Sequence, residues 1–152
     1  MIDLNPIGVV HNERTELSDD HWGEVISSIE LLPPLTAESL EGLETFSHVE
    51  VIYFFDRVPE EKVESVSRHP RNNPAWPKVG IFAQRGKNRP NRLGACIARV
   101  LARQGATLSV SGLDALDGTP VLDIKPVLRE FLPRTEVTQP GWATELMKNY
   151  WE

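Results

Sequence analysis

The chain is short of cysteine and has no long apolar run. Cys96 is the one cysteine, which excludes an internal disulfide and fits a reducing cytoplasm. No apolar run approaches the roughly 18 residues of a membrane helix, and residues 1–6 lack the basic and apolar parts of a signal peptide. We therefore expect a cytoplasmic protein with no membrane segment. Its 152 residues suit one domain that buries about two-thirds of its unfolded surface.

Several catalytic and binding motifs are also absent. There is no G-x-S-x-G, no P-loop and no G-x-G-x-x-G after a strand, so the sequence does not support a serine hydrolase, a nucleoside triphosphatase or a dinucleotide-binding fold. No metal site is expected, because the cysteine and the four histidines have no metal-ligand spacing.

Negative charge is missing from one continuous part of the chain. Residues 68–113 hold nine bases and no acid, whereas residues 1–67 hold 15 acids and three bases. Residues 114–152 hold seven acids and four bases, and the net charge is −6. The distribution predicts a local positive surface that faces an anion. It does not predict a high-affinity nucleic-acid binder, because the acidic remainder would repel a long polyanion.

What the sequence does contain is a series of short strands. The strongest pattern, residues 46–57, places Val49, Val51, Tyr53 and Phe55 on one face. Residues 94–103 also suit a helix, but a hairpin turn at 104–106 favours a strand. Short strands joined by turns predict a mainly β (α+β) protein with a small closed β-barrel. The other expected strands are residues 7–11, 25–31, 107–112 and 120–126.

Three further segments complete the expected fold. Thr36 could cap a short, weak helix, residues 58–77 form an excursion or a partly ordered loop, and residues 79–83 read as a short buried strand. Residues 142–151 predict a helix with Trp142, Leu146 and Tyr150 on one side. Such a helix needs a partner surface, either its own barrel or a second subunit. The expected division is therefore a barrel domain, 1–138, and a helical tail, 139–152.

The stretch after residue 83 is basic and has no helix or strand period. Arg85, Lys87, Arg89 and Arg92 stand among Pro, Asn and Gly. Several forked donors on a loop suit a carboxylate, a phosphate or a ribose. A solvated basic loop is the alternative. The density of Pro, Asn and Gly favours a binding site, because these residues fix the backbone shape.

Acidic residues near this block allow two interpretations. Asp114 and Asp117 flank a turn, and Asp56 follows the strongest strand. They could serve ordinary turn chemistry, or they could bind an ammonium, a ribose diol or an adenine amine. A ligand that carries both a carboxylate and a positive centre would explain why both signs are present.

Several stretches resemble the TsaA-like (TrmO-like, YaeB-like) family, and they occur in the family's order over roughly residues 5–135. The resemblance implies a small β-barrel, a homodimer, and S-adenosylmethionine bound near the subunit interface. The activity it implies is N6-methylation of threonylcarbamoyladenosine beside the anticodon of threonine tRNA. The matching stretches are Ile7-Gly8-Val9-Val10, Phe46-Ser47-His48-Val49, Gly80-Ile81-Phe82-Ala83-Gln84-Arg85, Arg89-Pro90-Asn91-Arg92-Leu93-Gly94 and the long run from Leu113 to Pro126.

The same resemblance assigns site residues. Arg85 and Asn91 are expected to orient the cofactor and the acceptor, and catalysis would be mainly in-line positioning. The basic loop from Arg85 to Arg92 is a candidate contact for tRNA. The expected cofactor contacts are Trp22, Gly23 and Glu24 (the weakest match), Asp56, Arg57, Arg85, Gly94, Ala95, Asp114, Ala115, Leu116 and Asp117.

The sequence also departs from the family pattern. The tRNA-methylating form usually reads Thr-Arg-Ser-x-x-Arg-Pro-Asn-Pro-Ile-Gly where this chain has residues 84–94, and Lys-Pro-Tyr where it has Lys125-Pro126-Val127. Residues 1–152 resemble a short form without the C-terminal domain that helps hold tRNA. Two alternatives therefore stay open, namely a methyltransferase of a small-molecule acceptor and a non-catalytic cofactor-binding module.

Overall fold

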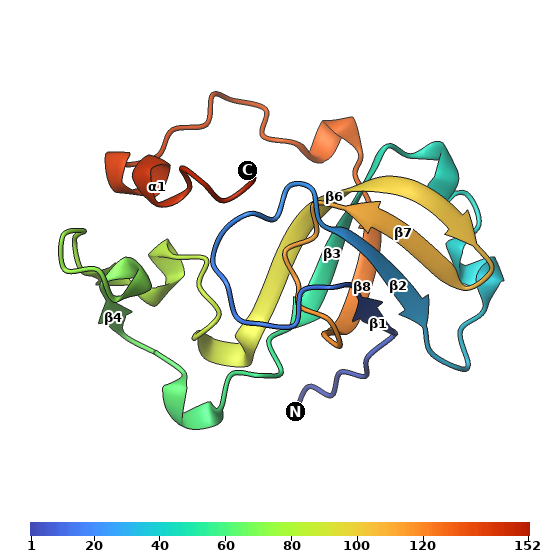
Figure 1. The fold of residues 1–152 in the computed structure, drawn as a ribbon, viewed down its shortest axis with the longest axis horizontal. Coiled ribbons are helices and arrows are strands. Elements are labelled where there is room, and N and C mark those ends of the chain that lie inside the picture. Colours follow the sequence, from blue (N-terminus) through green and yellow to red (C-terminus); the bar gives the residue numbers. More distant parts are fainter.

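A closed antiparallel barrel dominates the computed structural model, which describes residues 1–152. Six strands close in the order β1-β2-β7-β6-β3-β8 (Figure 1). The prediction of a small closed β-barrel is confirmed. The barrel strands are β1 (Gly8–His11), β2 (Ile26–Leu31), β3 (His48–Phe54), β6 (Leu93–Gln104), β7 (Thr107–Ser111) and β8 (Pro120–Pro126).

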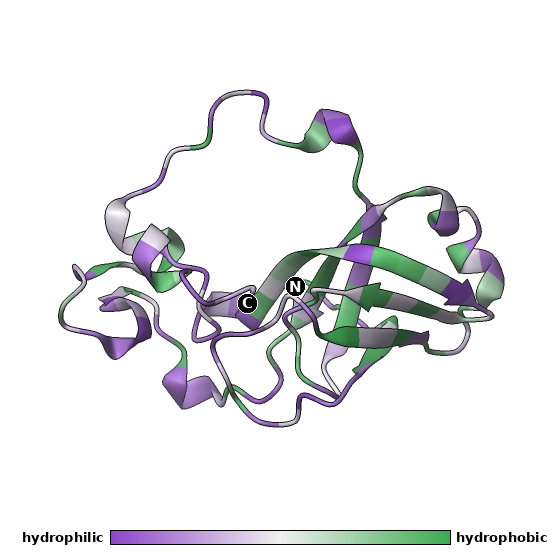
Figure 2. Ribbon diagram, turned by 45° about the horizontal axis from the view of Figure 1, so that its top comes forward, coloured by the Kyte–Doolittle hydropathy of each residue, from purple (hydrophilic) through white to green (hydrophobic).

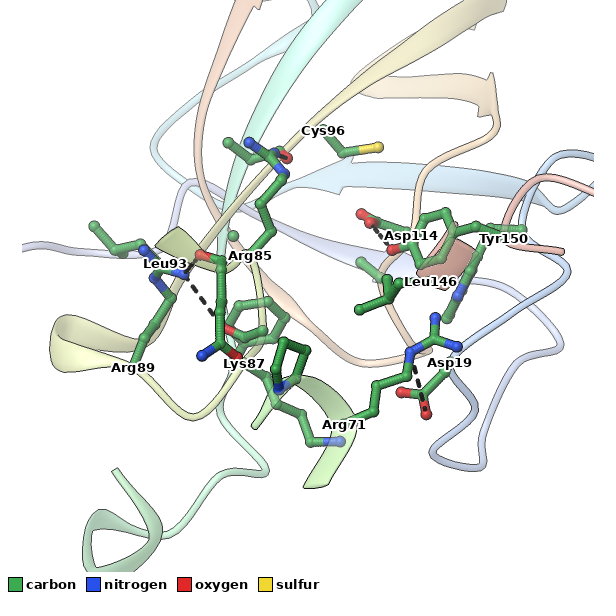
Figure 3. A pocket seen from close by; sticks show the side chains of 18 of the residues that line it. Asp19, Arg71, Arg85, Lys87, Arg89, Leu93, Cys96, Asp114, Leu146 and Tyr150 are labelled. Atoms are coloured by element: carbon green, nitrogen blue, oxygen red, sulfur yellow. Dashed lines mark hydrogen bonds and ion pairs between the residues drawn. The ribbon is translucent and has the colours of Figure 1, made fainter. Parts of the chain in front are cut away.

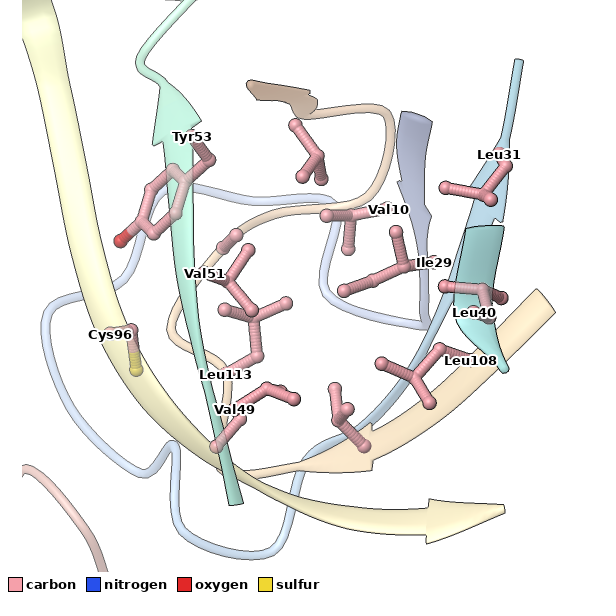
Figure 4. Close-up of a cluster of buried hydrophobic side chains, with 14 residues drawn as sticks. Val10, Ile29, Leu31, Leu40, Val49, Val51, Tyr53, Cys96, Leu108 and Leu113 are labelled. Carbon is pink, nitrogen blue, oxygen red and sulfur yellow. The ribbon is translucent and has the colours of Figure 1, made fainter. Parts of the chain in front are cut away.

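The barrel interior is filled by β-branched and aliphatic side chains that alternate along the strands. On β3 the buried residues are Val49, Val51 and Tyr53, as the period-two pattern predicted. Fourteen buried residues form one cluster (Figure 4). Tyr53 and Cys96 lie together at one end of this cluster, and that end is where the core meets the cleft described below.

Strand β6 is the longest element and connects the barrel to the basic loop. Its twelve residues pair with β3 along the first half and with β7 along the second, with an irregularity between Val100 and Ala102. The preference for strand over helix at 94–103 is therefore confirmed. Thr36 lies next to a 3-10 turn rather than an α-helix, and its side chain makes no capping hydrogen bond.

The excursion between β3 and β6 consists of short turns and one two-stranded ribbon. The ribbon pairs β4 (Ser67–Arg68) with β5 (Val79–Gly80). The predicted buried strand at 79–83 is a strand only at Val79–Gly80, since Ile81–Ala83 is a 3-10 turn. The predicted burial is right only for Ile81, and Phe82 is 76% exposed. The 3-10 turns of the chain are η1 (Ala37–Leu40), η2 (Leu43–Thr45), η3 (Glu60–Lys62), η4 (Pro70–Asn72), η5 (Ile81–Ala83), η6 (Pro90–Arg92) and η7 (Arg129–Phe131).

The C-terminal segment leaves the barrel and returns to it. Residues 132–140 are exposed and arch away from the barrel (Figure 2). The predicted helix at 142–151 is wrong in length, because α1 covers only Gly141–Leu146. Turns follow, and the chain then docks on its own loop at residues 21–23. No helix in the protein is both long enough and apolar enough to span a membrane.

Candidate functional site

A cleft of about 1240 Å³ is lined by residues of the excursion, of the C-terminal segment and of one end of the barrel. It brings together most of the residues that the sequence singled out, although they come from distant parts of the chain. The labelled side chains in Figure 3, Arg85 and Asp114 among them, approach the same space from different sides. The predicted site residues that line the cleft are Trp22, Asp56, Arg57, Arg85, Asn91, Gly94, Ala95, Asp114, Ala115 and Leu116.

Three predicted contacts lie outside this cleft. Gly23 and Glu24 line a smaller hollow of about 570 Å³ together with Trp151. Asp117 is used in turn chemistry, since its Oδ1 accepts the Asn12 backbone N–H at 3.0 Å. For Asp117 the structure therefore matches the turn interpretation.

The basic loop has a fixed backbone, and two of its arginines fix it. Asn91 and Arg92 have left-handed φ angles of 63° and 49°, a conformation uncommon for residues other than glycine. The Arg89 guanidinium donates to the Gln84 carbonyl at 2.6 Å, and that of Arg92 donates to Val58 at 2.6 Å. These two cations therefore stabilise the loop itself.

Arg85 is in a different position from these two. Its Nη2 donates to the Ala95 carbonyl at 2.6 Å, and the residue is otherwise exposed and lines the cleft. A guanidinium has five N–H donors in a planar fork. One hydrogen bond therefore orients Arg85 and leaves donors for an anionic group in the cleft.

The opposite side of the cleft carries a carboxylate held by two tyrosines. Tyr53 on β3 donates its hydroxyl to Oδ1 of Asp114 at 2.6 Å, and Tyr150 donates to Oδ2. Burial, followed by the charge of Asp114, raises the pKa of both tyrosines above their ordinary values. Both hydroxyls therefore remain protonated donors at neutral pH.

The loop between β1 and β2, residues 12–25, lies beside the cleft, and three arginines stabilise it. Arg14 stacks on the Trp22 ring, with the guanidinium carbon 3.9 Å from the ring centroid. Arg71, which lines the cleft, forms an ion pair with Asp20 at 3.0 Å. Arg57 donates to the Thr15 carbonyl at 2.6 Å, so this predicted cofactor contact also anchors the loop.

Cys96 forms part of the cleft wall but is not a reactive thiol. It is 7% exposed, and its sulfur donates to the Gly112 carbonyl at 3.3 Å. Burial, with a further contribution from Asp114, raises the pKa of the thiol above its ordinary value.

We predict that iodoacetamide leaves Cys96 unmodified at pH 8 in the native protein and alkylates it readily in denaturant. Mass spectrometry of the intact protein measures both, and rapid native alkylation would contradict this burial.

The sequence reasoning missed four cleft residues. The sequence places Tyr53 only on one face of a strand and Tyr150 only on one side of a helix, and it assigns no role in the site to Cys96 or Arg71. The available signal was weak, since a tyrosine on an inward face carries a hydroxyl that needs a partner when it is buried. The sequence alone does not identify that partner as Asp114.

A family model and individual relatives both place this chain among the tRNA-methyltransferase O-like proteins. Residues 17–131 match the model of the tRNA-methyltransferase O N-terminal domain. A Pyrococcus abyssi protein described as a "probable S-adenosyl-L-methionine-binding protein" is 35% identical over 147 residues, which cover 93% of this chain and 76% of that protein. The human tRNA (adenine(37)-N6)-methyltransferase is 38% identical over 111 residues, covering 73% of this chain and 25% of the human enzyme.

Solved structures show the same likeness. The crystal structure of TrmO from Pseudomonas aeruginosa superposes with a TM-score of 0.74 at 31% identity, covering 94% of this chain and 63% of that one. The chain thus spans less than two-thirds of the solved chain and a quarter of the human enzyme. With the family model matched over most of its length, the chain belongs to the family of the tRNA-methyltransferase O N-terminal domain.

Proposed function

We propose that this protein is an S-adenosylmethionine-dependent methyltransferase whose acceptor is N6 of threonylcarbamoyladenosine in tRNA. The observation that carries the proposal is the cleft, where Arg85 and Asp114 both line one space. Family membership supports the methyltransferase class. The Pyrococcus relative, described as S-adenosyl-L-methionine-binding, supports the cofactor, and the human tRNA (adenine(37)-N6)-methyltransferase supports the tRNA adenine. The threonylcarbamoyl group rests on the family resemblance.

The donor set of the cleft fits the cofactor. S-adenosylmethionine carries a carboxylate, an ammonium, a sulfonium, a ribose diol and an adenine. Arg85 can receive the carboxylate, Asp114 can accept from a nitrogen donor, and Trp142 and Leu146 offer apolar surface. The cleft of about 1240 Å³ exceeds the roughly 300–1,000 Å³ of ordinary ligand pockets, so it leaves room for an acceptor base.

In this proposal the protein contributes position rather than acid–base chemistry. When bound, S-adenosylmethionine supplies a methyl group on a good leaving group, the sulfonium. Arg85 holds one end of the ligand, and Asn91, at the rigid left-handed turn of the basic loop, faces the same cleft. Holding two reactants in line can provide much of the rate enhancement of a transfer reaction. The acceptor nitrogen loses one proton as the new N–C bond forms.

Partners follow from the same proposal. The basic loop is the proposed contact for tRNA, a homodimer would complete the cofactor site at the subunit interface, and the site of action would be the cytoplasm. Because Arg89 and Arg92 are engaged with backbone carbonyls and Arg85 is assigned to the cofactor carboxylate, we expect Lys87 to supply most of the phosphate contacts from this loop.

The experiment has two stages. Titration calorimetry of S-adenosylmethionine and S-adenosylhomocysteine first tests the cofactor. Methyl-labelled cofactor is then incubated with threonine tRNA that carries threonylcarbamoyladenosine, and with the same tRNA lacking that modification. We predict label only in the modified tRNA, and nucleoside mass spectrometry locates the methyl group. Cofactor binding without transfer to any acceptor would favour a non-catalytic module.

Two observations favour a second candidate, a methyltransferase of a small acceptor. The protein has a net charge of −6, and two of the four basic-loop cations, Arg89 and Arg92, are engaged with backbone carbonyls. Both features weaken a long polyanion's attraction to the cleft. Label transfer to a small amine, with none to tRNA, would establish this candidate over the first.

A further inference from the structure

The C-terminal tail, residues 139–152, lines one side of the cleft, and one of its polar groups bonds a carboxylate that comes from the barrel side. Its Tyr150 donates to one oxygen of Asp114, while Tyr53 of β3 donates to the other. Tyr150 also stands edge-on to Trp151, with ring centroids 4.9 Å apart. In the close-up, Asp114, Leu146 and Tyr150 lie together on one side of the cleft (Figure 3).

The position of the tail does not depend on the Tyr150 hydroxyl alone. The His21 backbone N–H donates to the Asn149 carbonyl at 3.1 Å, and that of Trp22 donates to the Tyr150 carbonyl at 2.8 Å. Gly23 packs so closely that an added Cβ would stand 2.0 Å from the Trp151 carbonyl oxygen. Backbone contacts therefore hold the tail in place without the Tyr150 hydroxyl, so this hydroxyl can have a role other than docking the tail.

The role of the Tyr150 hydroxyl is to orient the carboxylate of Asp114. Each oxygen of Asp114 accepts one tyrosine hydroxyl, and a carboxylate oxygen can accept more than one donor. The raised pKa of both tyrosines keeps both hydroxyls as donors. Two donors from separate elements fix the plane of the carboxylate, and Asp114 lines the cleft, where it can accept a further hydrogen bond.

We infer that Tyr150 is a positioning residue: together with Tyr53 it holds the Asp114 carboxylate so that it accepts an N–H hydrogen bond from the ligand in the cleft. The inference rests on the proposed function, because S-adenosylmethionine is the ligand in question. That molecule offers two groups of the required chemistry, the ammonium of its amino-acid part and the exocyclic amine of adenine.

The test compares Tyr150→Phe with Thr144→Ala by titration calorimetry. The first variant removes only the hydroxyl, and the second removes a hydroxyl from the same tail outside the cleft. We expect Tyr150→Phe to weaken S-adenosylmethionine binding at least tenfold, because the bond it supports involves a charged group. Thr144→Ala should bind as the wild type does. Equal affinity for Tyr150→Phe and wild type, or an equal loss in both variants, would overturn the inference.

A second readout separates positioning from simple docking. In Tyr150→Phe the His21 and Trp22 amides should keep their wild-type protection in hydrogen exchange, because they bond tail carbonyls. In Gly23→Ala the clash with Trp151 should expose those amides and weaken binding as well. Loss of amide protection in Tyr150→Phe would show that Tyr150 docks the tail and does not specifically position Asp114. If Tyr150→Phe does not fold, Tyr53→Phe removes the other donor and serves the same comparison.

Methylthioadenosine distinguishes the two nitrogen groups, because it keeps the adenine amine and lacks the ammonium. A loss for S-adenosylmethionine alone would place the ammonium at Asp114, and an equal loss for both ligands would place the adenine there. Either result supports the inference. If wild-type protein binds neither S-adenosylmethionine nor S-adenosylhomocysteine, the proposed function fails and the inference falls with it. If wild type binds and Tyr150→Phe binds equally, only the inference fails.

Discussion

Arg85→Ala is expected to weaken S-adenosylmethionine binding by at least about 100-fold while the protein stays folded. The guanidinium makes one hydrogen bond, to the Ala95 carbonyl, and the residue is exposed at the cleft. Its removal should therefore change stability by less than about 0.5 kcal/mol, as at most surface sites. In the proposed complex, however, it pairs with a carboxylate, and truncating one partner of such a pair typically costs about 2–5 kcal/mol.

Calorimetry measures the affinity, and thermal unfolding followed by circular dichroism measures the fold. Arg99→Ala is the matched control, because it removes one cation from the neighbouring strand β6 and does not line the cleft. Its affinity should equal that of the wild type. Unchanged affinity in Arg85→Ala would show that this arginine does not hold the ligand.

The barrel could be predicted from the sequence because each strand is encoded by the alternation of apolar residues within its own few positions. A strand that alternates Val49, Val51 and Tyr53 inward has one buried face wherever it pairs, so the pattern alone specifies its role. The same holds for 94–103, where the turn that follows resolved the ambiguity between helix and strand. The closed barrel was predicted from several such short strands joined by turns, whereas the pairing and register of the strands come from the structure.

The errors lie where distant contacts override local pattern. Residues 79–83 are apolar, but a short apolar run does not distinguish a strand from other structures, and here the chain turns at Ile81. The predicted helix at 142–151 ends at Leu146, and further along the carbonyls of Asn149 and Tyr150 accept the backbone N–H groups of His21 and Trp22 instead of helical partners. No periodicity encodes a contact between residues so far apart.

The candidate site shows the same division. Motif resemblance identified ten residues that line the cleft, including Arg85 and Asp114. It did not identify the two tyrosines on Asp114, since hydrogen bonds from Tyr53 and Tyr150 depend on the closed barrel and the returning tail. It singled out Arg85 among the basic-loop cations but assigned no separate role to Arg89 and Arg92, which the structure shows to stabilise the loop.

Gly94→Ala is expected to destabilise the protein by about 1–3 kcal/mol, the usual range for overpacking a core, and to impair ligand binding. Gly94 lies directly opposite Tyr53 in the β3–β6 ladder. An added Cβ would stand 2.5 Å from two ring carbons of Tyr53, so the ring must move. The ring is restrained by its hydrogen bond to Asp114 and by Phe55, whose ring centroid is 5.3 Å away.

This glycine was predicted as a backbone contact for the cofactor, and the structure adds a packing reason for it. Thermal unfolding and calorimetry measure the two effects. Gly80→Ala is the control, because an added Cβ there meets only one atom, at 3.8 Å, and the residue does not line the cleft. A melting temperature for Gly94→Ala equal to that of Gly80→Ala would contradict the predicted clash.

A double-mutant cycle with Tyr53→Phe then tests where the strain goes. Without its hydroxyl the ring is no longer tethered to Asp114 and can turn away from the new methyl group. The double variant should therefore lose less stability than the sum of the two single variants, since contacting residues are rarely additive. Strict additivity would mean that the Asp114 tether does not restrain the ring, and the tyrosine hydroxyl would then have no part in fixing the geometry of the cleft.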